Sequence, residues 1–284
     1  MRKLVAVVIP VWKENLSGFE EISLRQSSSI LNKHTFYLIS YRGLNIKKIT
    51  DILEEKSVRY KLVFFKKKSF SSIADYSRLM LSVGFYGRFI KYKYILLYQL
   101  DCFVFRDELE SWADAGYSYI GAPWLKGYGE AKPDAPVIGV GNGGLSLRNV
   151  ADHLNVLFSF SFIEKPRHFF GMYANNLLIK ALKSFLFCIS NATVQNNTFF
   201  LFNNWSSNED IFWAEIATRN FSWFKVPEYQ IASRFSTEVQ PRYFYELHRK
   251  ETPFGCHAWW TYDFEFWKPH IEKFGYNLIT HVDG

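Results

Sequence analysis

The sequence YILLYQLD, residues 94–101, is the most informative stretch of this chain. Its apolar run, Tyr94 to Tyr98, is typical of a strand that is buried on both faces of a sheet. Gln99, Leu100 and Asp101 follow directly. A carboxylate at the end of such a strand is costly to bury without a partner. Asp101 therefore indicates either a structural role, as a helix N-cap or in a buried salt bridge, or a divalent cation that bridges to phosphates.

Strand and helix patterns alternate upstream of this stretch. Strands are predicted at 4–9, 35–41 and 60–65, and helices at 19–31, 46–55 and 72–89. Such alternation predicts an α/β fold, in which a mostly parallel central sheet is flanked by helices on both faces. Ligands bind these sheets outside the carboxyl ends of the strands, so the polar residues that follow each strand are the first site candidates.

Composition limits the class of protein. The chain has 284 residues, of which 48% are hydrophobic and 21% charged, as in a globular domain. Its net charge of +7 favours anionic partners such as nucleotide phosphates. We expect no nucleic-acid partner, because the sequence contains none of the usual nucleic-acid-binding motifs. The run Lys66-Lys67-Lys68 is better interpreted as a solvated strand end. Three widely spaced cysteines without CxxC spacing indicate a reducing, cytoplasmic location.

Membrane association is a separate hypothesis. The apolar run 4–9 is short and ends at Pro10, which favours a first strand over a signal peptide. No uninterrupted apolar stretch reaches the roughly 18 residues of a membrane-spanning helix. The stretch 176–189, NLLIKALKSFLFCI, predicts either a buried helix or peripheral contact with the inner face of a membrane.

Three further motifs are chemically informative. His257, in GCHAWW, is either a metal ligand together with carboxylates or a hydrogen-bonded core residue. Glu209 and Asp210 open a predicted helix, where they serve either as N-terminal capping charges or as a general base. The segment 141–144, GNGG, permits close backbone approach, and it matches neither a dinucleotide-binding nor a Walker motif.

Five segments occur in a characteristic order: YILLYQLDCFVF (94–105), YSYIGAPW (117–124), GNGGLSLR (141–148), NEDIFW (208–213) and PFGCHAWW (253–260). Together they resemble a bacterial glycosyltransferase-like family catalogued as a domain of unknown function, DUF5672, with GT-A-like architecture. The resemblance implies one Rossmann-type GT-A-like domain over 1–284. Residues 1–110 would form a nucleotide-binding half and 111–284 an acceptor-binding half, with a variable helical insertion at about 150–203.

The resemblance also implies roles for the motifs. GT-A enzymes hold a divalent cation, Mn²⁺ or Mg²⁺, with a D-x-D motif, which Gln99, Leu100 and Asp101 match except at the first position. Asp101 and His257 would then be the metal ligands, or the metal would be weak or absent. Asn142, Gly143 and Gly144 resemble the segment that meets the donor sugar.

The start of the helix predicted at Asn208-Glu209-Asp210 resembles the acidic xED motif of these enzymes. Asp210 would be the general base of an inverting enzyme, with Glu209 in reserve, whereas in a retaining enzyme the carboxylate would only bind the acceptor.

The remaining expectations concern ligands. Pro10, Val11 and Trp12 would cradle the nucleotide base, and the alternative for Trp12 is an exposed position at an edge. Arg42 and Arg78 would meet phosphate. The loop 126–136 would close over the site. The donor would be a UDP-sugar and the acceptor an oligosaccharide or lipid-linked glycan, in surface polysaccharide synthesis. The alternatives are a non-catalytic carbohydrate- or nucleotide-binding protein and a metal-dependent nucleotidyltransferase.

Overall fold

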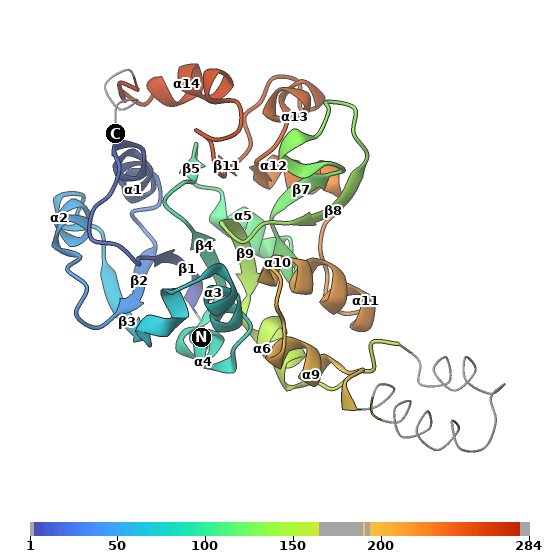
Figure 1. Ribbon diagram of the computed structural model, residues 1–284. Coiled ribbons are helices and arrows are strands. Elements are labelled where there is room, and N and C mark those ends of the chain that lie inside the picture. The colour runs from blue at the N-terminus through green and yellow to red at the C-terminus, as the bar shows by residue number, and fades with distance from the viewer. Residues whose placement is uncertain (1–2, 165–189, 191–193, 279–284) are drawn as a thin grey trace, which may run out of the picture.

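The computed structural model describes residues 3–164, 190 and 194–278, and a six-stranded sheet lies at its centre (Figure 1). The strand order is β3-β2-β1-β4-β9-β6. The strands are β1 (Lys3–Pro10), β2 (Thr35–Tyr41), β3 (Tyr60–Phe65), β4 (Tyr92–Tyr98), β6 (Tyr119–Ile120) and β9 (Leu145–Asn149). The first four are parallel, and β9 runs antiparallel to β4 and β6. The predicted α/β class with a mostly parallel sheet is confirmed, and the arrangement agrees with the GT-A-like fold that the resemblance implies.

Alternate residues of β1 serve two different cores. Val5, Val7 and Ile9 pack with α1 (Gly18–Ile30), α2 (Lys47–Glu55) and α5 (Leu109–Asp114). Ala6 and Val8 pack with α3 (Ile73–Met80), α4 (Val83–Tyr86) and α6 (Val150–Phe158) on the other face. Each fully buried aliphatic side chain of this kind stabilises the fold by about 1.5–3 kcal/mol, so the central strands tolerate few polar residues.

Local side-chain caps set the helix boundaries. The Oγ of Ser17 accepts from the backbone N–H of Glu20, whose carboxylate accepts from Ser17 N–H in return, so α1 begins in a capping box. The helix predicted over 72–89 is wrong as a single helix. It is divided into α3, α4 and the 3₁₀ turn η2 (Gly87–Phe89), because the Ser82 hydroxyl caps Phe85 N–H at 3.1 Å and starts a new helix.

Two small sheets position the polar edge of the central sheet. Strand β5 (Phe103–Val104) pairs with β11 (Gly255–Cys256), which pairs with β10 (Ser236–Thr237). Strands β7 (Ala122–Leu125) and β8 (Val137–Gly141) form a hairpin. The pairing of Phe103 with Cys256 brings Asp101 next to His257, although the two lie far apart in sequence.

The other described helices, apart from the first in the following list, lie in the second half of the chain. They are η1 (Lys67–Phe70), η3 (Tyr128–Glu130), α9 (Thr198–Asn203), α10 (Glu209–Ile211), a π-helical segment (Phe212–Ala217), α11 (Thr218–Asn220), α12 (Tyr229–Phe235), α13 (Pro241–Leu247) and α14 (Phe264–Glu272). The predicted helix that Glu209 and Asp210 open begins at Glu209. Phe235 and Phe254 pack into the same core as β1 and β4, so the two predicted halves share a core.

The predicted helical insertion at about 150–203 is described at its two ends, by α6 and α9. The stretch 176–189, for which membrane contact is one hypothesis, lies outside the described residues. None of the helices in the described part of the chain is long and apolar enough to span a bilayer.

Candidate active site

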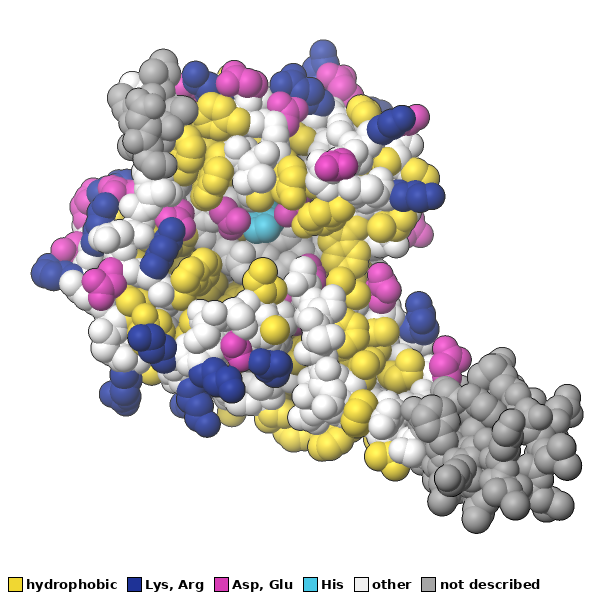
Figure 2. All heavy atoms as spheres, in the orientation of Figure 1, with side chains coloured by type: hydrophobic (Ala, Val, Ile, Leu, Met, Phe, Trp, Pro, Cys, Tyr) yellow, Lys and Arg dark blue, Asp and Glu magenta, His cyan; other side chains and the backbone are white. Residues whose placement is uncertain are grey.

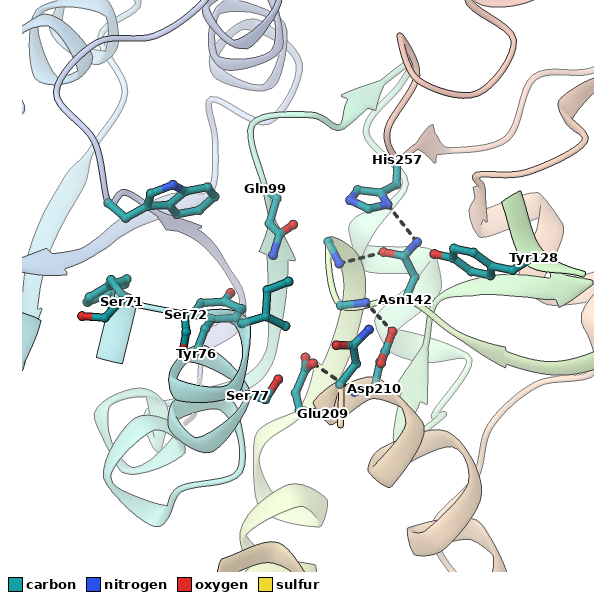
Figure 3. A pocket seen from close by; sticks show the side chains of 16 residues that line it. Ser71, Ser72, Tyr76, Ser77, Gln99, Tyr128, Asn142, Glu209, Asp210 and His257 are labelled. Carbon is teal, nitrogen blue, oxygen red and sulfur yellow. Dashed lines mark hydrogen bonds between the residues drawn. The ribbon is translucent and has the colours of Figure 1, made fainter. Parts of the chain in front are cut away.

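A cavity of about 460 Å³ lies at the carboxyl edge of the central sheet. It is lined by Trp12, Phe70, Ser71, Ser72, Ile73, Tyr76, Ser77, Gln99, Tyr128, Asn142, Gly143, Gly144, Asn208, Glu209, Asp210 and His257. Figure 2 shows this hollow, with a His side chain at its floor and acidic side chains beside it. The close view in Figure 3 places His257 on one side, Glu209 and Asp210 on the opposite side, and Asn142 between them.

One ring nitrogen of His257 is hydrogen-bonded to Glu238, and the other faces Asp101. Its Nδ1 lies 2.8 Å from Oε1 of Glu238, a residue that is 3% exposed. Oε2 of Glu238 accepts from the Tyr128 hydroxyl and from the Asn142 amide, each at 3.0 Å. Nε2 lies 3.2 Å from Oδ2 of Asp101, yet neither Nε2 nor Asp101 Oδ1 has a hydrogen-bond partner. Nε2 of His257 and Oδ1 of Asp101 are thus two buried polar atoms without a hydrogen bond to any described residue.

The charges of this group are strongly coupled. Burial disfavours a charged imidazole, but the carboxylates of Asp101 and Glu238 hold the pKa of His257 well above its ordinary value. Burial raises the pKa of Asp101, but the charge of His257 and the hydrogen bonds to the carboxylate together outweigh burial, so that the net pKa is lowered. The site thus favours positive charge between two carboxylates. That charge is either a proton on the imidazole or a metal cation bound in place of the proton.

The donor atoms fit a divalent cation. The ligand atoms of Asp101, Cys102 and His257 lie within 4.8 Å of one another. The Cys102 thiol is buried and donates to the carbonyl of Gly144 at 3.3 Å, which leaves a carboxylate and an imidazole as the available pair. A carboxylate behind the second ring nitrogen, here Glu238, is the usual arrangement that fixes the tautomer of a metal-binding histidine.

The glycine-rich segment makes room for this histidine. Oδ1 of Asn142 accepts from the N–H groups of Gly144, at 2.7 Å, and Leu145, at 2.9 Å, which folds the segment into a tight turn. A Cβ added to Gly144 would lie 2.0 Å from Nε2 of His257, and one added to Gly143 would lie 3.2 Å from Oε2 of Glu209. These glycines are needed for close approach to side chains.

The opposite wall carries two unequal carboxylates. Arg148 of β9 is fully buried and donates from Nη2 to Oε1 of Glu209 at 2.6 Å. The other oxygen of Glu209 accepts from Asp210 N–H, and Oδ2 of Asp210 accepts from Gly143 N–H at 3.1 Å. Burial, followed by the charge of Glu209, raises the pKa of Asp210 to about 7. Asp210 is therefore a carboxylate whose proton affinity suits general-base work near neutral pH.

A family model described as a protein of unknown function, DUF5672, matches residues 59–257, which is well over half of the chain. The chain belongs to this family. The matched region contains most of the residues that line the cavity of this DUF5672 chain, from Phe70 to His257. The comparison with curated proteins finds no match.

Several glycosyltransferases are among the solved structures to which this chain is similar. The galactosyltransferase LgtC, in complex with donor and acceptor sugar analogs, is 12% identical with a TM-score of 0.47, and the match covers 89% of this chain and 86% of that one. Core-mannan synthase A from Aspergillus fumigatus, in its Mn/GDP form, is 11% identical with a TM-score of 0.35. That match covers 44% of this chain and 43% of the synthase, so it spans less than half of either. A glycosyltransferase involved in glycosylation of the major capsid of PBCV-1 is 10% identical with a TM-score of 0.40, over 95% of this chain and 99% of that one.

The structure brings most predicted site residues of the DUF5672 chain together. Trp12, Gln99, Asn142, Gly143, Gly144, Glu209, Asp210 and His257 line the one cavity. Asp101 adjoins it through His257. Pro10, Val11 and Leu100 do not line it, and lie instead around a small crevice beside Trp12. The Leu100 side chain is buried and packs into the core of the sheet.

The two predicted phosphate-binding arginines lie elsewhere. Arg78 is on α3, whose residues Tyr76 and Ser77 face the cavity, but its own side chain turns away and pairs with Asp75 at 2.6 Å. Arg42 lines a separate cleft. Neither position therefore supplies positive charge to the cavity.

Glu238 and Tyr128 are the functional candidates that the sequence did not reveal. Glu238 directly follows β10, so the rule that polar residues after strands form sites applies to it. That strand has only two residues, Ser236 and Thr237, and no periodicity marks it in the sequence. Tyr128 lies in the loop 126–136, where only tertiary contact with Glu238 identifies it.

Proposed function

We propose that this chain is a glycosyltransferase that moves a sugar from a UDP-sugar donor to a hydroxyl of a glycan acceptor. One observation carries the proposal. His257, which pairs with Asp101 at 3.2 Å, lines one side of the cavity, and Asp210, with a pKa raised to about 7, lines the other. An inverting sugar transfer from a nucleotide needs both functions, namely charge neutralisation at the leaving diphosphate and a base at the acceptor.

Asp101 and His257 would hold the divalent cation, Mn²⁺ or Mg²⁺, with Glu238 behind the imidazole. When bound, such an ion neutralises negative charge on a leaving diphosphate. The lining of the cavity contains no Lys or Arg, so the described side chains offer a diphosphate no cation of their own there. Arg148 lies behind Glu209 and is paired with it.

Asp210 would act on the acceptor. In an inverting transfer, the acceptor oxygen forms a bond to the anomeric carbon while the bond from that carbon to the diphosphate oxygen breaks. The hydroxyl proton then passes to the Asp210 carboxylate. Glu209 is paired with Arg148, and its charge adds to the effect of burial in raising the pKa of Asp210. In a retaining transfer, Asp210 would instead bind the acceptor.

The remaining assignments concern the nucleotide base and the acceptor at the same cavity. Trp12 lines it with 42% of its surface exposed, which leaves a ring face for the nucleotide base. The acceptor would be an oligosaccharide or a lipid-linked glycan, and the role that we propose is surface polysaccharide synthesis.

Calorimetry of UDP binding tests the proposal, with Mn²⁺ and then with a chelator, on the wild type and on Asp101→Ala. We expect UDP binding that needs the metal and that weakens by about tenfold or more in the variant, as is typical of lost metal-site ligands. Asp51→Ala is a matched control, because Asp51 is exposed on α2 and pairs only with Lys47. UDP binding that is unaffected by both the chelator and Asp101→Ala would overturn the metal-dependent site.

A non-catalytic binding protein is the second candidate, and Gln99 favours it. A neutral amide stands on the cavity wall where the GT-A motif has its first carboxylate. Metal-dependent UDP binding without turnover of any UDP-sugar in an acceptor screen would support this candidate over the transferase.

A further inference from the structure

A second hollow, of about 450 Å³, lies beside the edge strand β3 and shares no residue with the lining of the candidate active site. It is lined by Tyr41, Arg42, Phe64, Phe65, Lys66, Lys67 and Arg88. We call it the cationic cleft. Four of its seven residues are cations and none is acidic. Figure 2 shows Lys and Arg side chains gathered on this side of the molecule, below and to the left of the hollow that contains the histidine.

Aromatic rings replace carboxylates as the partners of these cations. The guanidinium of Arg42 lies 5.3 Å from the centre of the Phe64 ring, and that of Arg88 lies 5.9 Å from the Phe65 ring. The ammonium of Lys67 lies 5.4 Å from the Tyr41 ring. Ring faces hold a cation in place without neutralising its charge.

The charge of the cleft is therefore uncompensated. Across the described part of the chain, none of its four cations forms an ion pair, whereas other exposed cations such as Arg25, Lys47 and Arg242 do. Cations from three separate segments, the ends of β2 and β3 and the turn before β4, converge on one concave space. Convergent Arg and Lys donors in a hollow are the arrangement that recognises phosphate oxygens.

We propose that the cationic cleft is a second ligand site, which binds a phosphate or diphosphate group. The ligand is either a free phosphorylated compound or the headgroup of an anionic lipid, since both present the same oxygens to the cleft. The site does not depend on the proposed sugar transfer, because its lining residues are different.

Protection of the sheet edge does not account for these features. Lysines beside an exposed edge strand also discourage strand-to-strand association. That role needs charge along the strand, but it does not need Arg42 and Arg88, which lie on other elements, to face the same hollow. Nor does it need three cations seated over rings.

The cleft adjoins the candidate active site through one aromatic contact. The rings of Tyr41, which lines the cleft, and Phe70, which lines the active-site cavity, are 6.0 Å apart. Lys67 and Phe70 belong to the same turn, η1. A phosphate held in the cleft would thus lie behind the wall of the cavity, and the rest of its molecule would have a short path to that cavity.

Calorimetry with inorganic pyrophosphate tests the site, with excess chelator present so that no divalent ion supports binding at Asp101 and His257. We expect the wild type to bind and the variant Arg42→Gln/Lys67→Gln to bind at least about tenfold more weakly, since the variant loses two charge-assisted contacts to phosphate oxygens. Arg219→Gln/Lys273→Gln is the matched control, because it removes the same two charges from exposed positions outside the cleft. Circular dichroism checks that each variant is folded.

Sedimentation with phosphatidylglycerol vesicles, and with phosphatidylcholine vesicles for comparison, separates the two sources of phosphate. Binding to phosphatidylglycerol that pyrophosphate displaces supports a lipid headgroup, and pyrophosphate binding without vesicle binding supports a free compound. Absence of pyrophosphate binding in the wild type, or equal affinity in the wild type and the cleft variant, would overturn the site. Vesicle or nucleic-acid binding that pyrophosphate does not displace would also overturn it, in favour of a diffuse basic surface.

Discussion

Gly144 shows how one missing side chain supports the site. The nearest atom to a Cβ at this position would be Nε2 of His257, at 2.0 Å, a separation that no real contact allows. The imidazole is largely buried and is tied to Glu238 at its other nitrogen, so it has little freedom to retreat. Residue 144 must therefore lack a side chain if His257 is to keep its place.

Gly144→Ala should displace the imidazole. We expect metal-dependent UDP affinity to fall by about tenfold or more and stability to fall by about 1–3 kcal/mol, the usual effect of overpacking. Calorimetry and urea unfolding measure the two effects. Gly84→Ala is the matched control, because the nearest atom to its added Cβ is 3.9 Å away and alanine favours the helix α4. Wild-type UDP affinity in Gly144→Ala would show that His257 does not depend on this space.

Asp210 should give the enzyme a pH dependence near neutrality. Since a base must be ionised, we expect kcat/KM to fall as the pH drops below the pKa of about 7, and Asp210→Asn to lose most of its turnover at every pH. A pH–rate profile of both proteins, with UDP affinity followed alongside, measures this. A value of kcat/KM that does not change with pH around pH 7 would show that Asp210 is not the base.

The same group makes a stability prediction with a definite sign. The folded pKa of about 7 lies above the ordinary 3.8, so the folded chain binds this proton more tightly than the unfolded chain. The stabilisation is present at acid pH and is lost as the pH rises through about 7. From pH 5 to 8 the free energy of unfolding of the wild type should therefore decline relative to that of Asp210→Asn in urea titrations. A constant difference would mean that the pKa of Asp210 is not raised.

Short elements, more than long ones, set the geometry of the site. The two-residue strands β5, β10 and β11 place Asp101, Glu238 and His257 at one point. The hairpin β7–β8 carries the loop 126–136, whose ends are joined by a hydrogen bond from Lys126 N–H to the Pro136 carbonyl at 2.9 Å. The Tyr128 hydroxyl ties this loop to Glu238.

Tyr128→Phe should release the loop from the site. The substitution keeps the ring but removes the hydroxyl that donates to Glu238, which leaves a buried carboxylate with one donor fewer. We expect trypsin cleavage after Lys126 to become several-fold faster, because cleavage follows local opening. Tyr117→Phe is the control, since no hydrogen bond to the Tyr117 hydroxyl is seen among the described residues. Equal cleavage rates in the variant and the wild type would show that the hydroxyl does not hold the loop.

Across the whole molecule, the positive net charge is not evenly distributed between the two hollows. The chain carries +7, yet the candidate active site is lined by carboxylates without Lys or Arg, while unpaired cations gather in the cationic cleft. The cavity is also built from both halves of the chain, with Trp12 and Gln99 from one and Asn142, Asp210 and His257 from the other. The central sheet and the core that the two halves share bring these walls together.

The sequence by itself determined the sheet and the chemical types at its edge. Apolar runs such as 94–98 must be buried, and the polar residues after them must lie at the carboxyl edge, so Gln99 and Asp101 were predictable from local pattern. The tertiary structure alone decided which side chains meet. Arg42 and Arg78 have the right charge for a phosphate site, but the direction of each side chain places it away from the cavity. Glu238 has no sequence signal, and it became a candidate because strand pairing over long sequence separations, which no local pattern encodes, brings it to His257.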